Sequence, residues 1–244
     1  MSAPAAGRLL LVPTPIGNLG DMTPRAVEAL KAADHIAAED TRTSRRLLDH
    51  FGVATPVSSH HDFSSERERA RLLARLRAGE TVALISDAGM PGISDPAYRL
   101  VNEALEAGCQ VGALPGASSI LPALAASGLP TDRFRFIGFL PRKKGRQTAL
   151  AELVESPETT IFLEAPHRLA ATLEALAAAA PERRLCVARE ISKLHEEFLR
   201  GSVAELKEHF QRAGIRGEFV LVLEGDRAAA KRRRREQEDG EDEA

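Results

Sequence analysis

The sequence predicts an α/β protein with two domains, and three observations carry this prediction. In the first half of the chain, strand-like apolar runs alternate with helical patterns, which is typical of βαβ units around a mostly parallel sheet. In the second half, apolar runs are separated mainly by helices of about 10–15 residues, which indicates a mixed sheet. The 244 residues, 43% hydrophobic and 28% charged, can bury a sizeable core and are typical of a soluble globular protein.

The first domain should contain five strands with helices between them. A further helix begins after Glu39-Asp40 and carries Arg42, Arg45 and Arg46. The residues that can cap, begin or end the other helices are Thr23 and Pro24, then Ser64 or Ser65 with Gly79 at the end, then Pro96. The expected strands are Leu9–Val12, His35–Ala38, Pro56–Ser58, Thr81–Ile85 and Gln110–Leu114.

The second domain should contain four strands and, around residues 198–201, a shorter connection. A boundary is expected near Pro115-Gly116, which divides the chain into domains of residues 1–115 and 116–226. Residues 227–244 form a charged tail without apolar residues other than alanine, and we expect this tail to be disordered. The expected strands are Phe134–Phe139, Thr160–Leu163, Arg184–Ala188 and Phe219–Leu223.

Two loops follow expected strands and point to a ligand site. Ser86–Pro96 follows the strand Thr81–Ile85, and Pro13–Asp21 follows the first strand. In open α/β sheets ligands bind beyond the carboxyl ends of strands, and glycines allow close backbone approach. Taken alone, Ser86–Pro96 is equally explained as a tight loop before a helix. Neither loop has the spacing of a dinucleotide fingerprint or a P-loop, so a nucleotide-diphosphate site is not favoured.

Composition limits the other classes of function. No apolar run is long enough for a membrane helix and no signal peptide is indicated, so we expect a cytoplasmic protein without membrane contact. Cys109 and Cys186 lack metal-type spacing and are expected to be buried, reduced thiols. No metal is expected, because neither His60-His61-Asp62 nor Glu164 with His167 has convergent ligand spacing. With a net charge of -2, any recognition of phosphate must come from a local basic patch.

Seven motifs in order along residues 8–225 make the chain resemble the tetrapyrrole-methylase superfamily and, within it, the ribosomal small-subunit methyltransferase I branch. The resemblance implies a two-domain fold with S-adenosylmethionine in the cleft between the domains. It also implies methylation of a cytidine 2′-hydroxyl in 16S ribosomal RNA of the small ribosomal subunit, by a homodimer. The motifs are Pro13–Leu19, Ala38–Arg42, Ser86–Pro96, Pro115–Ser119, Gly138–Pro141, Glu164–Arg168 and Ala188–Glu190.

Three segments depart from the patterns of the superfamily or of the branch. Tetrapyrrole-type members carry Gly-x-Gly-x-Gly-Asp and Gly-Gly-Asp-Pro loops where this chain has Pro-Ile-Gly-Asn-Leu-Gly-Asp and Ser-Asp-Ala-Gly-Met-Pro. These differences argue against a porphyrinoid substrate. The segment Ser59–Phe63 differs from the Tyr-His-Glu-His-Asn expected in the branch, so the resemblance assigns it no role in RNA contact.

The resemblance also implies which residues touch the cofactor. Physical reasoning agrees in part, since Asp87 and the two serines are polar, Gly89 leaves room, and Ile93 provides an apolar wall. For Ser118 and Ser119, plain helix capping explains the residues as well. The cofactor contacts implied are Pro15, Asp87, Gly89, Ile93, Ser118, Ser119, Gly217 and Glu218.

A general base is a weaker expectation than the cofactor site, because alignment of the activated methyl group should supply most of the catalysis. The segment after the strand Arg184–Ala188 concentrates charges, and burial there could lower the pKa of a lysine. The hypothesis is that Lys193 or Glu197 assists the reaction. A solvated loop with one or two ion pairs explains the same residues.

Two basic clusters are candidates for RNA contact. Arg42, Arg45 and Arg46 begin a helix, and residues 142–146 place four cations beside Gly138–Pro141. Solvation of the surface is the other explanation. The expected RNA contacts are Arg42, Arg45, Arg46, Arg142, Lys143, Lys144 and Arg146.

Two other functions stay open at this point. One is methylation of a porphyrinoid or protein substrate on the same fold. The other is a non-catalytic RNA-binding assembly protein that keeps a ligand cleft, which would bind RNA without transferring a methyl group.

Overall fold

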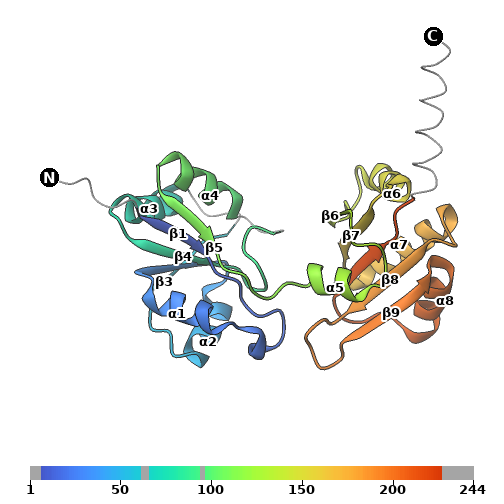
Figure 1. The fold of residues 1–244 in the computed structure, drawn as a ribbon, viewed down its shortest axis with the longest axis horizontal. Coiled ribbons are helices and arrows are strands. Elements are labelled where there is room, and N and C mark those ends of the chain that lie inside the picture. Colours follow the sequence, from blue (N-terminus) through green and yellow to red (C-terminus); the bar gives the residue numbers. More distant parts are fainter. Residues whose placement is uncertain (1–6, 62–65, 94–96, 227–244) are drawn as a thin grey trace, which may run out of the picture. The chain divides into compact units, whose positions relative to one another are not determined.

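The chain divides into two compact units, residues 1–118 and 119–244, slightly beyond the boundary expected at Pro115-Gly116. The structure is a computed structural model that describes residues 7–61, 66–93 and 97–226. The expected helix caps Ser64, Ser65 and Pro96 and the charged tail lie outside these residues. Each unit is built on one five-stranded sheet (Figure 1).

In the first unit all strand pairs are parallel, in the order β3-β2-β4-β1-β5. The parallel first sheet is therefore confirmed, and every expected strand and helix is present. The strands are β1 (Arg8–Leu11), β2 (His35–Ala38), β3 (Val57–Ser59), β4 (Thr81–Ile85) and β5 (Gln110–Ala113). The helices are the 3-10 turn η1 (Leu19–Asp21), α1 (Pro24–Ala32), α2 (Thr41–His50), α3 (Glu66–Arg77) and α4 (Ala97–Glu106).

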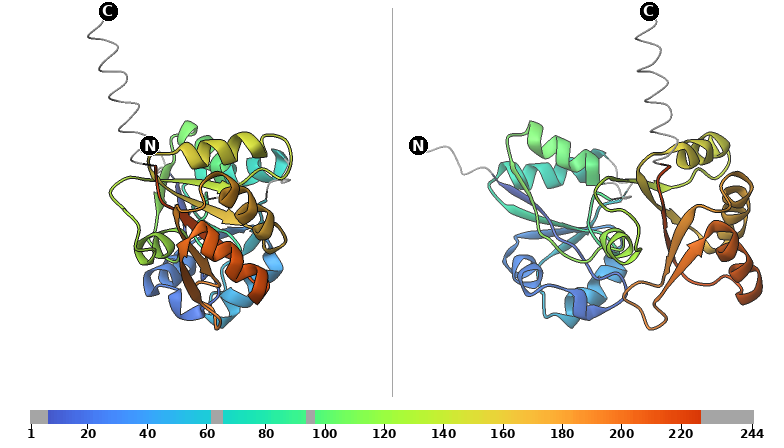
Figure 2. Two further views of the ribbon diagram at one scale, coloured as in Figure 1. Left: turned by 90° about the vertical axis from the view of Figure 1, so that its right-hand side faces the viewer. Right: turned by 45° about the vertical axis from the view of Figure 1, so that its right-hand side comes forward.

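Alternating side chains bury both faces of this sheet. Leu10 and Ile85 pack with α1 and α2, whereas Leu9 and Leu84 pack with α3 and α4. Helices therefore cover the two faces as separate layers, visible in Figure 1 and in the right-hand view of Figure 2. This arrangement explains why the strands are apolar runs rather than alternating ones. Because helices cover both faces, the ends of the strands are the part of this sheet where a ligand can bind.

The second unit has a mixed sheet, as expected, in the order β6-β7-β10-β8-β9. β6 and β7 are parallel, and the other pairs are antiparallel. The strands are β6 (Phe134–Phe139), β7 (Thr159–Glu164), β8 (Arg184–Arg189), β9 (Glu197–Ser202) and β10 (Phe219–Leu223). The helices are α5 (Ile120–Ala126), α6 (Arg146–Glu155), α7 (Pro166–Ala179) and α8 (Val203–Ala213).

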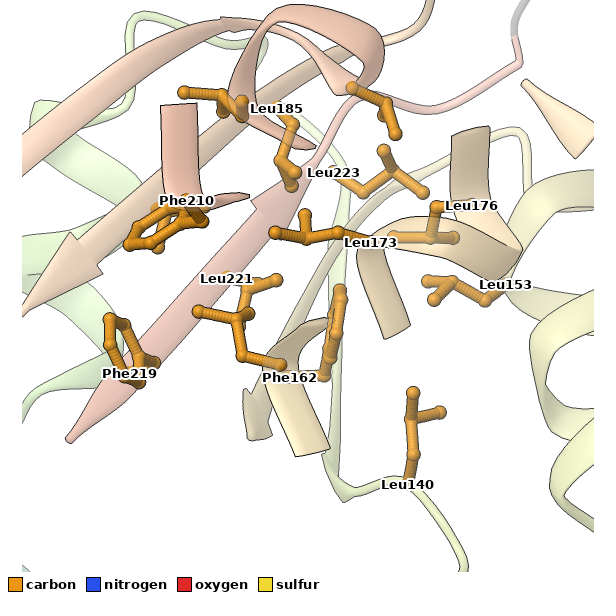
Figure 3. Packing of buried hydrophobic residues seen from close by; sticks show 14 of the residues in the cluster. Leu140, Leu153, Phe162, Leu173, Leu176, Leu185, Phe210, Phe219, Leu221 and Leu223 are labelled. Carbon is orange, nitrogen blue, oxygen red and sulfur yellow. The ribbon is translucent and has the colours of Figure 1, made fainter. Parts of the chain in front are cut away.

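The core of the second unit lies between its sheet and α6, α7 and α8. Phe162, Leu221 and Leu223 from the strands point toward Leu173 and Leu176 of α7 (Figure 3). Helix α5 contacts β10, which is buried along its whole length.

Cys109 of the first unit and Cys186 of the second are buried and free, as expected, and burial raises the pKa of the Cys186 thiol.

The expectation of a plain connection at residues 198–201 is wrong, because β9 pairs with β8 along its whole length. This strand is at the edge of the sheet and none of its residues is fully buried, so its sequence lacks an apolar run. Arg200 is exposed, and its guanidinium donates to the carbonyl of Ala126 at 2.6 Å. Pairing with a buried neighbour, rather than local hydrophobicity, makes this segment a strand.

His35 makes the stability of the first unit depend on pH. The ring is 6% exposed and its Nε2 lies 2.8 Å from Ser58 Oγ. Burial, followed by the charge of Arg75, lowers the pKa of His35 below its ordinary value of 6.5. The unfolded chain therefore takes up this proton more readily than the folded one. The contribution of His35 to stability is full above pH 6.5 and is lost as the pH falls through the lower folded-state pKa.

We expect His35→Gln, which keeps a hydrogen-bonding group beside Ser58, to flatten the fall in the free energy of unfolding as the pH is lowered from 7 to about 5.5. Urea unfolding at several pH values measures this slope. His167→Gln, which changes an exposed ring, is the control. Equal slopes for wild type and His35→Gln would contradict the assignment.

Candidate functional site

The two loops singled out in the sequence are hydrogen-bonded to each other. Thr14 and Gly89 form an isolated antiparallel bridge, in which each backbone N–H donates to the other's carbonyl at 3.0 Å. The hydroxyl of Thr14, which is 1% exposed, donates to the carbonyl of Ser86 at 3.0 Å. β1 and β4 are neighbours in the parallel sheet, so their loops leave the same edge. We call this set of contacts the Thr14–Gly89 clamp.

Glycines are needed where these loops approach each other. Gly89 has φ +79°, and a Cβ there would lie 3.3 Å from Ile16 Cγ2. Gly116, in the loop after β5, would place a Cβ only 2.7 Å from Pro13 Cβ. A side chain at either position would push the neighbouring loop away. The loops that follow β1, β4 and β5 therefore meet at one edge of the first sheet.

A cavity of about 490 Å³ lies beside the clamp. One wall is the loop after β1, the second is α2, and the third is the start of the loop after β4. Its volume is within the range of small-molecule sites, and its walls combine apolar side chains with few polar ones. The lining residues are Pro15, Ile16, Gly17, Asn18, Leu19, Thr43, Ser44, Arg46, Leu47, His50, Ser86, Asp87 and Ala88.

The cavity brings together residues that the sequence assigned to different ligands. Pro15 and Asp87 are expected cofactor contacts, and Arg46 is an expected RNA contact. Sequence analysis missed the contribution of Thr43, Leu47 and His50. The signal was present, because positions three and four apart share one face of a helix, and Arg46 was already on that face.

Asp87 is fastened to the start of α2. Its Oδ1 accepts the backbone N–H of Asp40 at 3.1 Å, and its own N–H donates to Glu39 Oε2 at 3.4 Å. Asp40 caps α2, because its side chain accepts the backbone N–H of Arg42 at 2.8 Å. This backbone bond, followed by a hydrogen bond from the Arg42 side chain, lowers the pKa of Asp40. The carboxylate of Asp87 is thus oriented while its residue remains exposed at the cavity wall.

The other expected cofactor residues of the first unit are outside the cavity lining. Gly89 is within the clamp, and Ile93 is 48% exposed. Ser118 is half-buried. In the second unit, Ser119 is the N-cap residue of α5, yet its side chain makes no capping hydrogen bond, so capping does not explain its hydroxyl.

In the second unit, Lys193 lies between two carboxylates. Its Nζ is 3.2 Å from Glu190 Oε1 and 3.1 Å from Glu218 Oε2. Burial lowers the pKa of Lys193, but the hydrogen bonds and charges of Glu218 and Glu190 outweigh it, so the pKa is raised. The expectation of a lowered lysine pKa is therefore wrong. Lys193 is an ammonium at neutral pH in this arrangement.

Glu190, Gly217 and Glu218 come together around that ammonium. We call Lys193, Glu190 and Glu218 the lysine cluster. Glu190 Oε1 accepts the N–H of Glu218 at 2.7 Å, and this bond, followed by Lys193, lowers the pKa of Glu190. Gly217 has φ +97°, and a Cβ there would lie 2.7 Å from Glu190 Cγ. Of the expected cofactor contacts, Glu218 is thus part of the lysine cluster and Gly217 is in contact with it. A cavity of about 360 Å³ is lined by Arg189, Glu190, His195, Arg216 and Gly217.

Glu197, the other candidate base, is apart from the lysine cluster. It begins β9, pairs with Arg189 of β8 in the sheet, and its Oε2 is 3.5 Å from Arg189 Nη1. Its side chain is 41% exposed. The ion pairs expected for a solvated charged loop are therefore present at both candidates.

The candidate RNA contacts fall into two groups. Arg42, Arg45, Arg142, Lys143 and Lys144 are exposed, and so is Arg46, which lines the first cavity. Arg146 differs, because its side chain is only 16% exposed and its guanidinium is 3.5 Å from the buried carboxylate of Glu164. Its cation is already engaged within the protein.

No membrane-spanning helix and no metal cluster can be identified in residues 7–61, 66–93 and 97–226. None of the helices there is long and apolar enough to cross a membrane. No group of three histidine, cysteine or acidic side chains in those ranges could hold a metal ion. Asp62 of the His60-His61-Asp62 segment lies outside the described residues.

Comparison with known proteins yields one family. Residues 8–207 match the model of the tetrapyrrole (corrin/porphyrin) methylases. The chain is 50% identical over 221 residues to "Ribosomal RNA small subunit methyltransferase I" of Halalkalibacterium halodurans, covering 90% of this chain and 76% of that protein. It is 51% identical over 221 residues to the protein of the same name from Synechocystis, covering 90% and 79%.

A solved structure of diphthine synthase shares the fold. Its TM-score is 0.68 at 18% identity, over 89% of this chain and 90% of that one.

The Thr14–Gly89 clamp can be tested with Thr14→Val. We expect the free energy of unfolding to fall by about 1–3 kcal/mol, because the buried carbonyl of Ser86 loses its donor. We also expect weaker binding of S-adenosylmethionine, since the loop carrying Asp87 is released. Urea unfolding and calorimetric titration measure the two effects.

Thr55→Val is the matched control, because Thr55 is 7% exposed and its hydroxyl donates to the carbonyl of Leu30 at 2.7 Å, at the other end of α1 from the loops. It should lose similar stability and keep cofactor affinity. If both variants bound the cofactor like wild type, the clamp would have no role in the site.

Proposed function

This chain belongs to the tetrapyrrole (corrin/porphyrin) methylase family, and we propose that it methylates the 2′-hydroxyl of a cytidine in 16S ribosomal RNA with S-adenosylmethionine. The relatives at about half identity are named for methylation of small-subunit ribosomal RNA. The observation that carries the proposal is the first cavity, whose lining includes Pro15, Asp87 and Arg46. Transfer to RNA requires the cofactor and the ribose to meet, so residues for both must share a site.

The first cavity suits part of such a cofactor. A volume of about 490 Å³ can hold a nucleoside-sized group, and Pro15, Ile16 and Leu47 offer apolar surface to its ring. The carboxylate of Asp87, held by Asp40, can accept hydrogen bonds from ribose hydroxyls or face a cationic group. S-adenosylmethionine supplies a methyl group already activated by its sulfonium. Gly89, Ile93, Ser118, Ser119, Gly217 and Glu218 remain proposed contacts.

The main task of the protein is then alignment of the ribose oxygen with the methyl carbon. The bond from the 2′-oxygen to the methyl carbon forms while the carbon–sulfur bond breaks, and the hydroxyl proton passes to solvent or to a base. We propose that Lys193 and Glu197 are the residues that assist. Because the pKa of Lys193 is raised, its contribution is a positive charge, and Glu197 is the group that can accept a proton.

We further propose that the protein is a homodimer in the cytoplasm. Both statements are carried over from the resemblance to the ribosomal branch. Light scattering of the purified protein tests the first, and fractionation of cells that produce it tests the second.

The reaction itself is tested with radiolabelled S-adenosylmethionine and three acceptors, namely assembled small subunits, naked 16S RNA and a porphyrinoid precursor. We expect label only in RNA, as 2′-O-methylcytidine after nuclease digestion and mass spectrometry. Label in the porphyrinoid would replace the proposal by methylation of that substrate. RNA binding without any methyl transfer would indicate an assembly protein.

Two variants of the first cavity are expected to weaken the binding of different ligands. Asp87→Asn should weaken cofactor binding by about tenfold or more, because hydrogen bonds to a charged group contribute about 1.5–3 kcal/mol, and should leave RNA affinity unchanged. Arg46→Gln should weaken RNA binding and lower its salt slope by roughly 0.7–0.9, with cofactor affinity unchanged. Calorimetry and filter binding measure the two affinities. If both variants affected the same ligand, the division of roles would be wrong.

Assistance at the 2′-hydroxyl predicts a loss of rate in single turnover. Glu197→Ala should lower the rate of methyl transfer by about 10²–10⁴-fold if it takes the proton. Lys193→Ala should lower it less, since a charge rather than a base is lost. Rapid quench with saturating RNA and cofactor measures both rates. Full single-turnover activity in both variants would remove these residues from the mechanism.

A further inference from the structure

The motif Glu164–Arg168 has no part in the proposed chemistry, yet among the described residues of the second unit it contains the most buried carboxylate. Glu164 ends β7 and is 1% exposed. A charge removed from water in this way destabilises a protein unless cations and hydrogen bonds surround it.

Two arginines and two other donors surround this carboxylate. Arg168 Nε is 3.0 Å from Oε1, and Arg146 Nη2 is 3.5 Å from Oε2. The N–H of Ala165 donates to Oε1 at 3.0 Å, and the hydroxyl of Thr172 donates to Oε2. Both oxygens are therefore satisfied from two helices, α6 and α7. We call these side chains the Glu164 network.

The same two arginines hold the backbone where the chain leaves β6. Arg168 donates to the carbonyl of Leu140 and, at 3.4 Å, to that of Pro141. Arg146 donates to the carbonyl of Pro141 at 3.3 Å. Leu140 is itself 2% exposed and belongs to the core of the unit. Residues 140–141, directly after β6, are thus tied to the buried carboxylate through two guanidinium groups.

The segment that starts at this point carries the exposed cations Arg142, Lys143 and Lys144. It ends one residue later, at Gly145, whose φ of +81° allows the turn into α6. The N–H of Arg146 closes the turn by donating to the carbonyl of Lys143 at 3.2 Å. Arg146 is therefore bonded to the residue before the basic segment and to its middle residue, by its side chain at Pro141 and by its backbone at Lys143.

We propose that Glu164 is a positioning residue for RNA binding, which acts through Arg146 and Arg168 to hold the basic segment 142–144 in one conformation against the phosphate backbone. This inference rests on the proposed function. A segment that is held in place before binding loses less conformational entropy on association. Its three cations therefore bind a polyanion more tightly than they would in a mobile segment. Arg146 acts inside the network and does not touch RNA.

Two variants test the network without removing an exposed cation. Glu164→Gln keeps the size of the side chain but leaves two guanidinium groups without their counter-charge. Arg146→Lys keeps the positive charge, but a single ammonium cannot reach Glu164, Thr172 and the Pro141 carbonyl together. We expect both to weaken binding of naked 16S RNA by about tenfold. The second variant keeps the test valid if Glu164→Gln does not fold.

Asp226→Asn is the matched control. Asp226 Oδ2 is 3.0 Å from the half-buried Arg183, and it follows Leu223, which pairs with Thr160 at the opposite end of β7 from Glu164. It should lose some stability, because an ion pair is removed, and keep RNA affinity. Thermal unfolding shows which variants are folded at the assay temperature.

A double-mutant cycle separates positioning from general destabilisation. In a chain with Arg142, Lys143 and Lys144 changed to glutamine, Arg146→Lys should have no further effect on RNA affinity or on its salt slope. An equal loss in both backgrounds would overturn the proposal, and so would wild-type affinity in a folded Glu164→Gln. Failure of the proposed function would look different, because the wild-type chain would then transfer no methyl group to RNA, whether or not it bound RNA.

Discussion

The pairing of Thr14 with Gly89 is the contact on which the candidate site depends. It joins the loops after two neighbouring parallel strands, and it requires a glycine because φ is +79° and Ile16 is close. The Thr14–Gly89 clamp brings two walls of the cavity together. Pro15 and Asp87 line the same cavity because the clamp places their loops side by side. Helix α2 forms a further wall, and the backbone N–H of Asp40 bonds its start to Asp87.

Paired charges determine what the second unit can contribute. Lys193 is stabilised as an ammonium by Glu190 and Glu218, and its raised pKa is unsuited to a general base. Glu164 is stabilised as a carboxylate by Arg146 and Arg168. In both clusters, groups that look catalytic by residue type serve first to neutralise a neighbour. Because Glu164 is buried, its charge requires these partners.

Most of the fold could be predicted from patterns along the chain. The parallel first sheet followed from apolar runs bounded by turns, and the cap at Thr23 and the helix start at Pro24 lie where they were expected. Strand β9 could not be predicted, since its residues become a strand by pairing with β8 rather than by their own hydrophobicity. The candidate site could be predicted in part: the two loops were singled out, whereas Thr43 and His50 were not.

By itself, the sequence determined the fold class and the family and singled out the two loops that meet at the candidate site, because apolar periodicity, glycine positions and ordered motifs are properties of the chain read in order. Tertiary structure alone decided that the pKa of Lys193 is raised and that Arg146 is largely buried. The sequence had suggested a lowered lysine pKa and an Arg146 that contacts RNA. The physical reason is that a side chain's pKa and exposure depend on charges brought close by folding. Glu218 is distant from Lys193 along the chain, and Glu164 from Arg146, yet each pair is in contact.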